Sequence, residues 1–112
     1  MRITFMLSGG LAGAVRGCRI DTGALVQAER LALEALVAAS GLTASFERFD
    51  AASRDRRQYD LAIERTTAFV RVSCDDASLP PPARPLVEDL LRRSTPQPLT
   101  FVVPMTAEGG LA

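Results

Sequence analysis

Residues 2–20 read RITFMLSGGLAGAVRGCRI, and this stretch contains two alternating patterns separated by a glycine-rich segment. Apolar side chains recur at every second position over residues 2–8 and again over residues 14–20, which is typical of strands with one buried face. The five residues 9–13 contain three glycines and are short enough to connect antiparallel neighbours. The stretch therefore predicts a β-hairpin.

The residues after this hairpin have the spacing of a helix. Asp21 or Thr22 can cap its start by accepting hydrogen bonds from the free amides of the first turn. Ser40-Gly41 ends it, with glycine at the position that favours a left-handed backbone. Leu33 and Val37 widen the predicted buried stripe. The stripe itself consists of Leu25, Ala28, Ala32, Leu36 and Ala39.

The second half of the chain repeats the strand–strand–helix order. Alternation over residues 58–64 and 68–74 predicts a second hairpin, preceded by a polar connection at 42–56. Pro80-Pro81-Pro82 predicts a rigid extended loop. A short second helix follows, marked by apolar residues over 86–91.

The order ββαββα predicts an α+β fold, in which an antiparallel sheet of four strands carries its helices on one face. Leu99–Val103 would add a short fifth strand. We expect a single domain over residues 1–94 and a C-terminal extension over 95–112, with the last eight residues mobile.

The amino-acid composition argues against several classes of function. The chain has 112 residues, no His, two Cys and a net charge of zero. The lack of His excludes Ser/His/Asp and Cys/His catalysis and His-containing zinc sites. Zero net charge argues against nucleic acid as a partner, because such binding depends on neutralising phosphates. We expect a protein that is not an enzyme and that needs no cofactor or metal.

Segments for targeting and membrane insertion are not expected. The first apolar run, Ile3–Leu7, is shorter than the roughly 7–15 residues of a signal peptide. Longer apolar runs also fall short of the ~20 residues that span a bilayer. The sequence predicts a soluble, cytoplasmic protein.

The cysteines and the paired acidic residues are not predicted to form a reactive or metal-binding site. Cys18 and Cys74 lie on apolar strand faces and are predicted to be buried free thiols, with a disulfide between neighbouring strands as the alternative. Asp75-Asp76 and Glu88-Asp89 are predicted to be solvated acidic pairs, because the turn glycine of a calcium loop is missing.

The glycine-rich connection is a weak phosphate site, because a strand and not a helix follows it. A plain hairpin turn and a recognition loop remain as interpretations. Leu11 belongs to neither alternation, which favours its display on such a loop.

Six blocks of the sequence form a recognisable pattern. They are Ile3-Thr4-Phe5, Ser8 to Gly13, Ile20-Asp21-Thr22, Leu36-Val37-Ala38, Arg57 to Leu61 and Leu79 to Val87. In order and spacing these blocks resemble the emfourin family of protein inhibitors. The resemblance covers roughly residues 2–93 and implies a sheet-plus-helices domain. It also implies a small cytoplasmic inhibitor of thermolysin-like zinc metallopeptidases, a class that favours a bulky apolar side chain just after the scissile bond.

Two loops offer such a side chain, one through Leu11 among glycines and one through Leu79 before three prolines. The candidate peptidase-binding residues are Gly9, Gly10, Leu11, Ala12, Gly13, Ser78, Leu79 and Pro80. The partner would be a thermolysin-like metallopeptidase. A protein-interaction module without inhibitory activity, such as a subunit of an assembly, is the alternative function.

Overall fold

The alternating segments form one sheet flanked by two helices in a computed structural model, which describes residues 1–9, 14–52 and 57–107. The strands are β1 (Arg2–Ser8), β2 (Arg16–Asp21), β3 (Phe46–Arg48), β4 (Gln58–Glu64), β5 (Phe69–Asp75) and β6 (Thr95–Pro96). The helices are α1 (Gln27–Ala39) and α2 (Arg84–Arg93), with short 3-10 turns η1 (Thr22–Ala24), η2 (Asp76–Ser78) and η3 (Pro81–Ala83).

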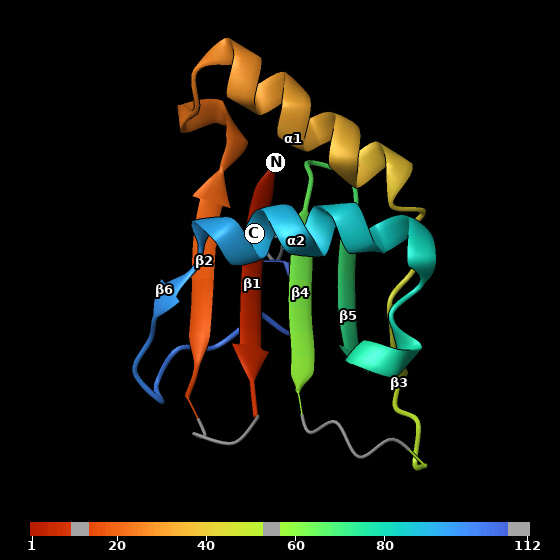
Figure 1. The fold of residues 1–112 in the computed structure, drawn as a ribbon. Coiled ribbons are helices and arrows are strands. Elements are labelled where there is room, and N and C mark those ends of the chain that lie inside the picture. Colours follow the sequence, from red (N-terminus) through yellow and green to blue (C-terminus); the bar gives the residue numbers. More distant parts are fainter. Residues whose placement is uncertain (10–13, 53–56, 108–112) are drawn as a thin grey trace.

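Both predicted hairpins are confirmed, but the sheet has two strands more than the four predicted. Its strand order is β3-β5-β4-β1-β2-β6 (Figure 1). The four central strands are antiparallel, whereas β3 runs parallel to β5, so the sheet is mixed and the predicted all-antiparallel ββαββα order is wrong. Residues 46–48 were expected in a polar connection. They pair because β5 offers an unoccupied row of backbone groups at its edge.

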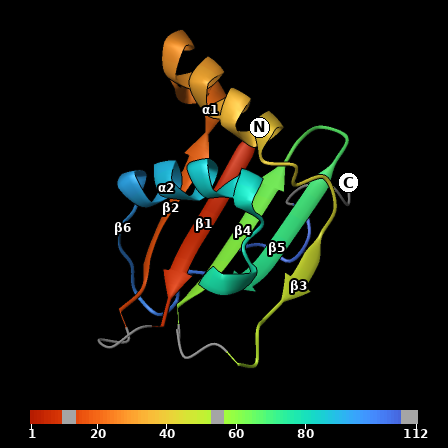
Figure 2. The same cartoon turned by 45° about the vertical axis from the view of Figure 1, so that its right-hand side comes forward.

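Both helices cover the same face of the sheet, as predicted (Figures 1 and 2). The strands turn their alternating apolar rows toward the helices, and Leu33 of α1 and Leu86 and Leu90 of α2 are completely buried against them. The sheet contributes Ile3, Phe5, Cys18, Ile20, Tyr59, Leu61, Ile63, Val70, Val72 and Cys74 to this core.

The start and the buried stripe of α1 differ from prediction. Asp21 caps η1 by accepting from the Gly23 amide, and α1 begins five residues after Thr22, without a side-chain cap. Leu33 and Val37 are buried, whereas the alanines of the predicted stripe, Ala28, Ala32 and Ala39, are exposed. Larger side chains remove more apolar surface from water, so they decide which way the helix faces.

Gly41 ends α1 in the left-handed region, at φ 72°, as predicted. The proline run differs from the extended loop that was expected, because Pro81–Ala83 forms the turn η3 directly before α2. The fixed φ of proline suits a 3-10 turn as well as an extended chain. Neither helix, among the described residues, is long and apolar enough to cross a membrane.

The chain after α2 covers part of the opposite face of the sheet. The predicted strand at Leu99–Val103 does not form. Thr95–Pro96 pairs with β2, and the chain then passes behind the strands (Figure 2). The side chains of Phe101 and Val103 are buried. Prolines at positions 98 and 104 remove the backbone donors that a longer ladder needs. The predicted mobility of the last eight residues falls largely outside the described part, which ends at residue 107.

Gly17 makes the contact with Phe101 sterically possible. A Cβ atom at this position would lie 2.8 Å from the Phe101 ring and 2.5 Å from the carbonyl oxygen of Phe5. The Arg19 guanidinium lies over the Phe101 ring, 4.4 Å from its centre, and its Nη2 donates to the Val102 carbonyl at 2.9 Å.

We expect Phe101→Ala to lower the free energy of unfolding by about 3 kcal/mol, because Phe101 is only 8% exposed. Leu99→Ala is the matched control: Leu99 is 86% exposed, and its loss should change stability by less than about 0.5 kcal/mol. Urea unfolding of both variants measures the difference. Equal stabilities would show that the C-terminal segment does not pack on the sheet.

Candidate functional site

One end of the sheet gathers the predicted binding segments. Ser8 at the end of β1 pairs with Gln58 at the start of β4, and Gln58 pairs with Asp75 at the end of β5. We call this end, at the bottom of Figure 1, the loop end. Adjacent strands lie about 4.8 Å apart, so the chain leaving β1 and the chain leaving β5 are roughly 10 Å apart across β4. Two loops that are distant in sequence thus lie at the same end of the sheet.

The first predicted segment is only partly described. Gly9 is exposed and has a φ of 85°, a left-handed conformation that glycine adopts without strain. Gly10, Leu11, Ala12 and Gly13 lie outside the described residues, so the display of Leu11 stays a prediction.

The second predicted segment is described in full. Ser78 and Pro80 are half-buried, but Leu79 is only 6% exposed and belongs to the hydrophobic core. The expectation that Leu79 displays its side chain is therefore wrong. Leu79 lies between η2 and η3, which return the chain from the loop end toward α2, and its side chain is buried against the sheet.

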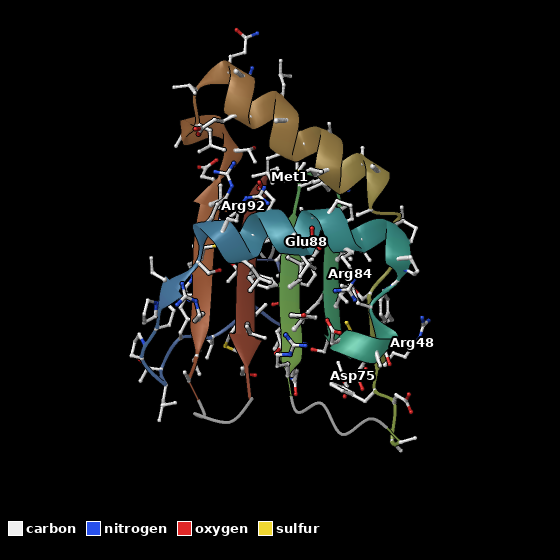
Figure 3. The ribbon with its side chains drawn as sticks, in the orientation of Figure 1. Met1, Arg48, Asp75, Arg84, Glu88 and Arg92 are labelled. Carbon is white, nitrogen blue, oxygen red and sulfur yellow. The ribbon has the colours of Figure 1, made fainter. Side chains whose placement is uncertain are left out.

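Asp76 connects three elements at the loop end. The Tyr59 hydroxyl donates to its carboxylate at 2.7 Å, and Arg84 at the start of α2 donates to the same oxygen at 3.2 Å. Arg84 also donates to the Asp76 backbone carbonyl, and Arg57 lies 3.9 Å from the carboxylate. Figure 3 shows Arg84 on the part of α2 nearest η2. These contacts fix η2 relative to β4 and α2.

The same contacts shift two pKa values in opposite directions. The hydrogen bond from Tyr59, with smaller contributions from Arg84 and Arg57, lowers the pKa of Asp76. Burial, followed by the hydrogen bond to the Asp76 carboxylate, raises the pKa of Tyr59 to about 12. The cluster therefore consists of a neutral phenol and an ionised carboxylate at neutral pH.

Asp75, the residue directly before η2, also holds this turn in place (Figure 3). It is buried, and its carboxylate accepts the backbone N–H groups of Asp50 at 2.9 Å and Ser78 at 3.0 Å. Hydrogen bonding from Ser78, then from the Asp50 backbone, keeps the pKa of Asp75 below its usual value.

The prediction that Asp75 and Asp76 form a solvated acidic pair is therefore wrong for Asp75 and incomplete for Asp76. Aspartate directly before a turn commonly accepts from the turn's backbone amides, and this local signal could have identified the capping role of Asp75. The ion pair with Arg84 depends on the folded position of α2. The other acidic pair behaves more as predicted: Glu88 is exposed, while Asp89 pairs with Arg92 and Arg93 along α2.

Comparison with known families gives one result for this chain. The Emfourin family model matches residues 5–91. The chain belongs to the emfourin family. Comparison with curated proteins and with solved structures gives no match. The family match runs from the middle of β1 into the last turn of α2, so it includes the whole loop end.

A second polar group of this emfourin-family chain lies on the face away from the helices. Asp60 is buried, accepts from the Ser73 hydroxyl and from Gln58 Nε2, and lies 3.6 Å from Arg71. A hollow of about 550 Å³ separates this group from the C-terminal segment. Asp60 and Arg71 compensate each other's charge, so we assign the group a structural role. Its burial could not be predicted, because the covering segment is distant in sequence.

The cysteines of this emfourin-family chain are buried free thiols, as predicted. Cys18 on β2 and Cys74 on β5 are separated by β1 and β4, which excludes the alternative disulfide between neighbouring strands. Burial raises the pKa of both thiols, that of Cys74 to about 11, which disfavours the reactive thiolate. The described residues contain no group of three or more His, Cys, Asp or Glu that could hold a metal ion.

We expect Leu79→Ala to lower the free energy of unfolding by about 3 kcal/mol, since it leaves a cavity beneath η2 and η3. Leu31→Ala is the matched control, because Leu31 is 54% exposed on α1 and should contribute less than about 0.5 kcal/mol. Thermal or urea unfolding measures both. A Leu79→Ala variant as stable as the unaltered protein would contradict the burial of this side chain.

Tyr59 is the one tyrosine of a chain without tryptophan, so ultraviolet absorbance of tyrosinate reports its ionisation directly. We expect a pKa near 12 in the folded protein, and a lower value in Asp76→Asn, which removes the negative charge beside the phenol. A raised folded-state pKa also means that stability is lost as pH rises above about 10, where the unfolded chain ionises first. Circular dichroism should follow this loss. An ordinary tyrosine pKa in the folded protein would contradict the Tyr59–Asp76 hydrogen bond.

Proposed function

We propose that this chain inhibits a thermolysin-like zinc metallopeptidase by placing the loop end of its sheet in the substrate cleft. The observation that carries the proposal is membership of the emfourin family over residues 5–91, since an inhibitory role toward metallopeptidases is what this family suggests. A cytoplasmic location and the absence of an enzymatic activity of its own are parts of the same proposal.

The geometry around η2, in the described part of the loop end, supports an inhibitor whose backbone is held there before binding. The carboxylates of Asp75 and Asp76 accept four hydrogen bonds, from Asp50, Ser78, Tyr59 and Arg84, so little conformational freedom remains at η2 to be lost on binding. Rigid loops reduce the free-energy cost of ordering at an interface. A rigid backbone also resists the adjustment that productive cleavage requires.

Within this function, the connection from β1 to β2 supplies the apolar contact that the sequence suggested. Leu11 is proposed as the side chain that enters the cleft, between the glycines at positions 9, 10 and 13. Glycines on both sides permit a close approach of the backbone to the enzyme. Leu79 cannot take this role, because its side chain is part of the hydrophobic core.

The test is an inhibition assay with the purified chain and a panel of thermolysin-like metallopeptidases that includes thermolysin. We expect inhibition that is competitive with a peptide substrate, because the loop end would occupy the same cleft. Binding without loss of peptidase activity would favour the alternative of an interaction module that does not inhibit. Failure to bind or inhibit any peptidase of the panel would contradict the proposal.

Leu11→Ala tests the contact. We expect it to weaken inhibition by about 2 kcal/mol or more while leaving the free energy of unfolding nearly unchanged. If Leu11 instead covered the end of the core, the same variant would lose roughly 2–5 kcal/mol of stability. Leu31→Ala, an exposed leucine on α1, serves as the control and should alter neither quantity.

A further inference from the structure

Phe49 is an aromatic side chain exposed at the loop end. It directly follows β3 and is 44% exposed. Because β3 runs parallel to β5 with Arg48 opposite Cys74, the next residue of each strand brings Phe49 beside Asp75. Phe49 therefore lies in the same row as Asp75, Gln58 and Ser8.

Other large exposed apolar residues in the described part of the chain belong to different regions. They are Val26 and Leu31 at the start and middle of α1, and Leu99, Val102 and Met105 in the C-terminal segment. Phe49 differs from them because it lies at the loop end, in the connection between β3 and β4. An exposed phenyl ring gains free energy when a partner covers it, and aromatic residues are enriched among the contacts that dominate protein interfaces.

The backbone is held on both sides of Phe49. Before it, β3 is hydrogen-bonded to β5. After it, the Asp50 amide donates to the buried Asp75 carboxylate at 2.9 Å, and the Asp50 carboxylate in turn accepts the Ala52 amide at 2.9 Å. Because the backbone is already fixed, little conformational entropy is lost when the side chain enters a pocket.

We propose that Phe49 is an anchor residue that inserts its ring into an apolar pocket of the inhibited peptidase. This inference rests on the proposed function and adds a residue to it. No sequence motif singles out Phe49, because it lies in a polar connection and reaches the loop end only through the parallel pairing of β3.

The position of Phe49 also separates its pocket from that of the β1–β2 connection. Three strand spacings of about 4.8 Å, from β3 through β5 and β4 to β1, place Phe49 roughly 14 Å from Ser8. An extended peptide advances about 3.4 Å per residue, so this distance corresponds to about four residues of a bound substrate. An elongated substrate cleft can therefore accept both ends of the row at once, in different subsites.

The experiment compares Phe49→Ala, Phe49→Leu and the control Leu31→Ala for inhibition of a peptidase that the unaltered chain inhibits. We expect Phe49→Ala to raise the inhibition constant at least about tenfold, since anchor contacts of this kind are typically worth that much or more. Phe49→Leu, which keeps a large apolar group, should stay within about threefold of the unaltered chain. Leu31→Ala should not change the inhibition constant. The melting temperatures of all three should match that of the unaltered chain, because both side chains are exposed.

The outcomes separate this inference from the function on which it rests. An unaltered inhibition constant for Phe49→Ala, in an assay where the unaltered chain inhibits, would overturn the role of Phe49 and leave the proposed function standing. Equal weakening by Phe49→Ala and Leu31→Ala, or weakening that accompanies a lowered melting temperature, would also overturn it. Absence of inhibition by the unaltered chain across the whole panel would overturn both proposals.

Discussion

The carboxylate of Asp75 joins two connections of the sheet that are 25 residues apart in the sequence. A buried carboxylate is costly unless hydrogen-bond donors surround it, and here the donors are the backbone amides of Asp50 and Ser78. Neither connection can move away without leaving the charge short of a partner, so their conformations are coupled. Asp76, the next residue, ties η2 to β4 and α2 in the same manner. Two consecutive acids thus fix the part of the loop end around η2 and Asp50.

Elements that depend on neighbours in sequence could be predicted. Both hairpins follow from alternating apolar residues on either side of short connections, and α2 follows from the spacing of Leu86, Leu90 and Leu91. Placement of both helices on one face follows because each hairpin has a single strongly apolar row. The prediction of α1 shows the limit of periodicity. Alanines at helical spacing indicated one stripe, but the size of Leu33 and Val37 determined the buried side.

Elements that depend on distant partners could not be predicted. β3 is three residues long, and only the open edge of β5 makes it a strand. Leu79 was predicted to be exposed because it precedes three prolines, but the turns η2 and η3 direct its side chain into the core. At the candidate site, the glycine-rich connection and the segment 78–80 are distant in the sequence, and only the sheet register shows that they lie at the same end of the sheet. The contact of Asp75 with Asp50 and the position of Phe49 also depend on this register, so neither could be read from its own segment.

The packing of the C-terminal segment on β2 has a consequence for the order in which the chain matures during synthesis. Contacts such as Arg19 with the Val102 carbonyl and Gln97 with the Gly17 carbonyl join residues about 80 positions apart. In a chain made from its N-terminus, the segments that form both hairpins and both helices are synthesised before residues 97–103. Until then the hollow beside Asp60 lacks its C-terminal wall, and the edge of β2 is unpaired. Closure of this face therefore comes after the segments of the four central strands and both helices are made, when β6 covers an edge that a second nascent chain could otherwise pair with.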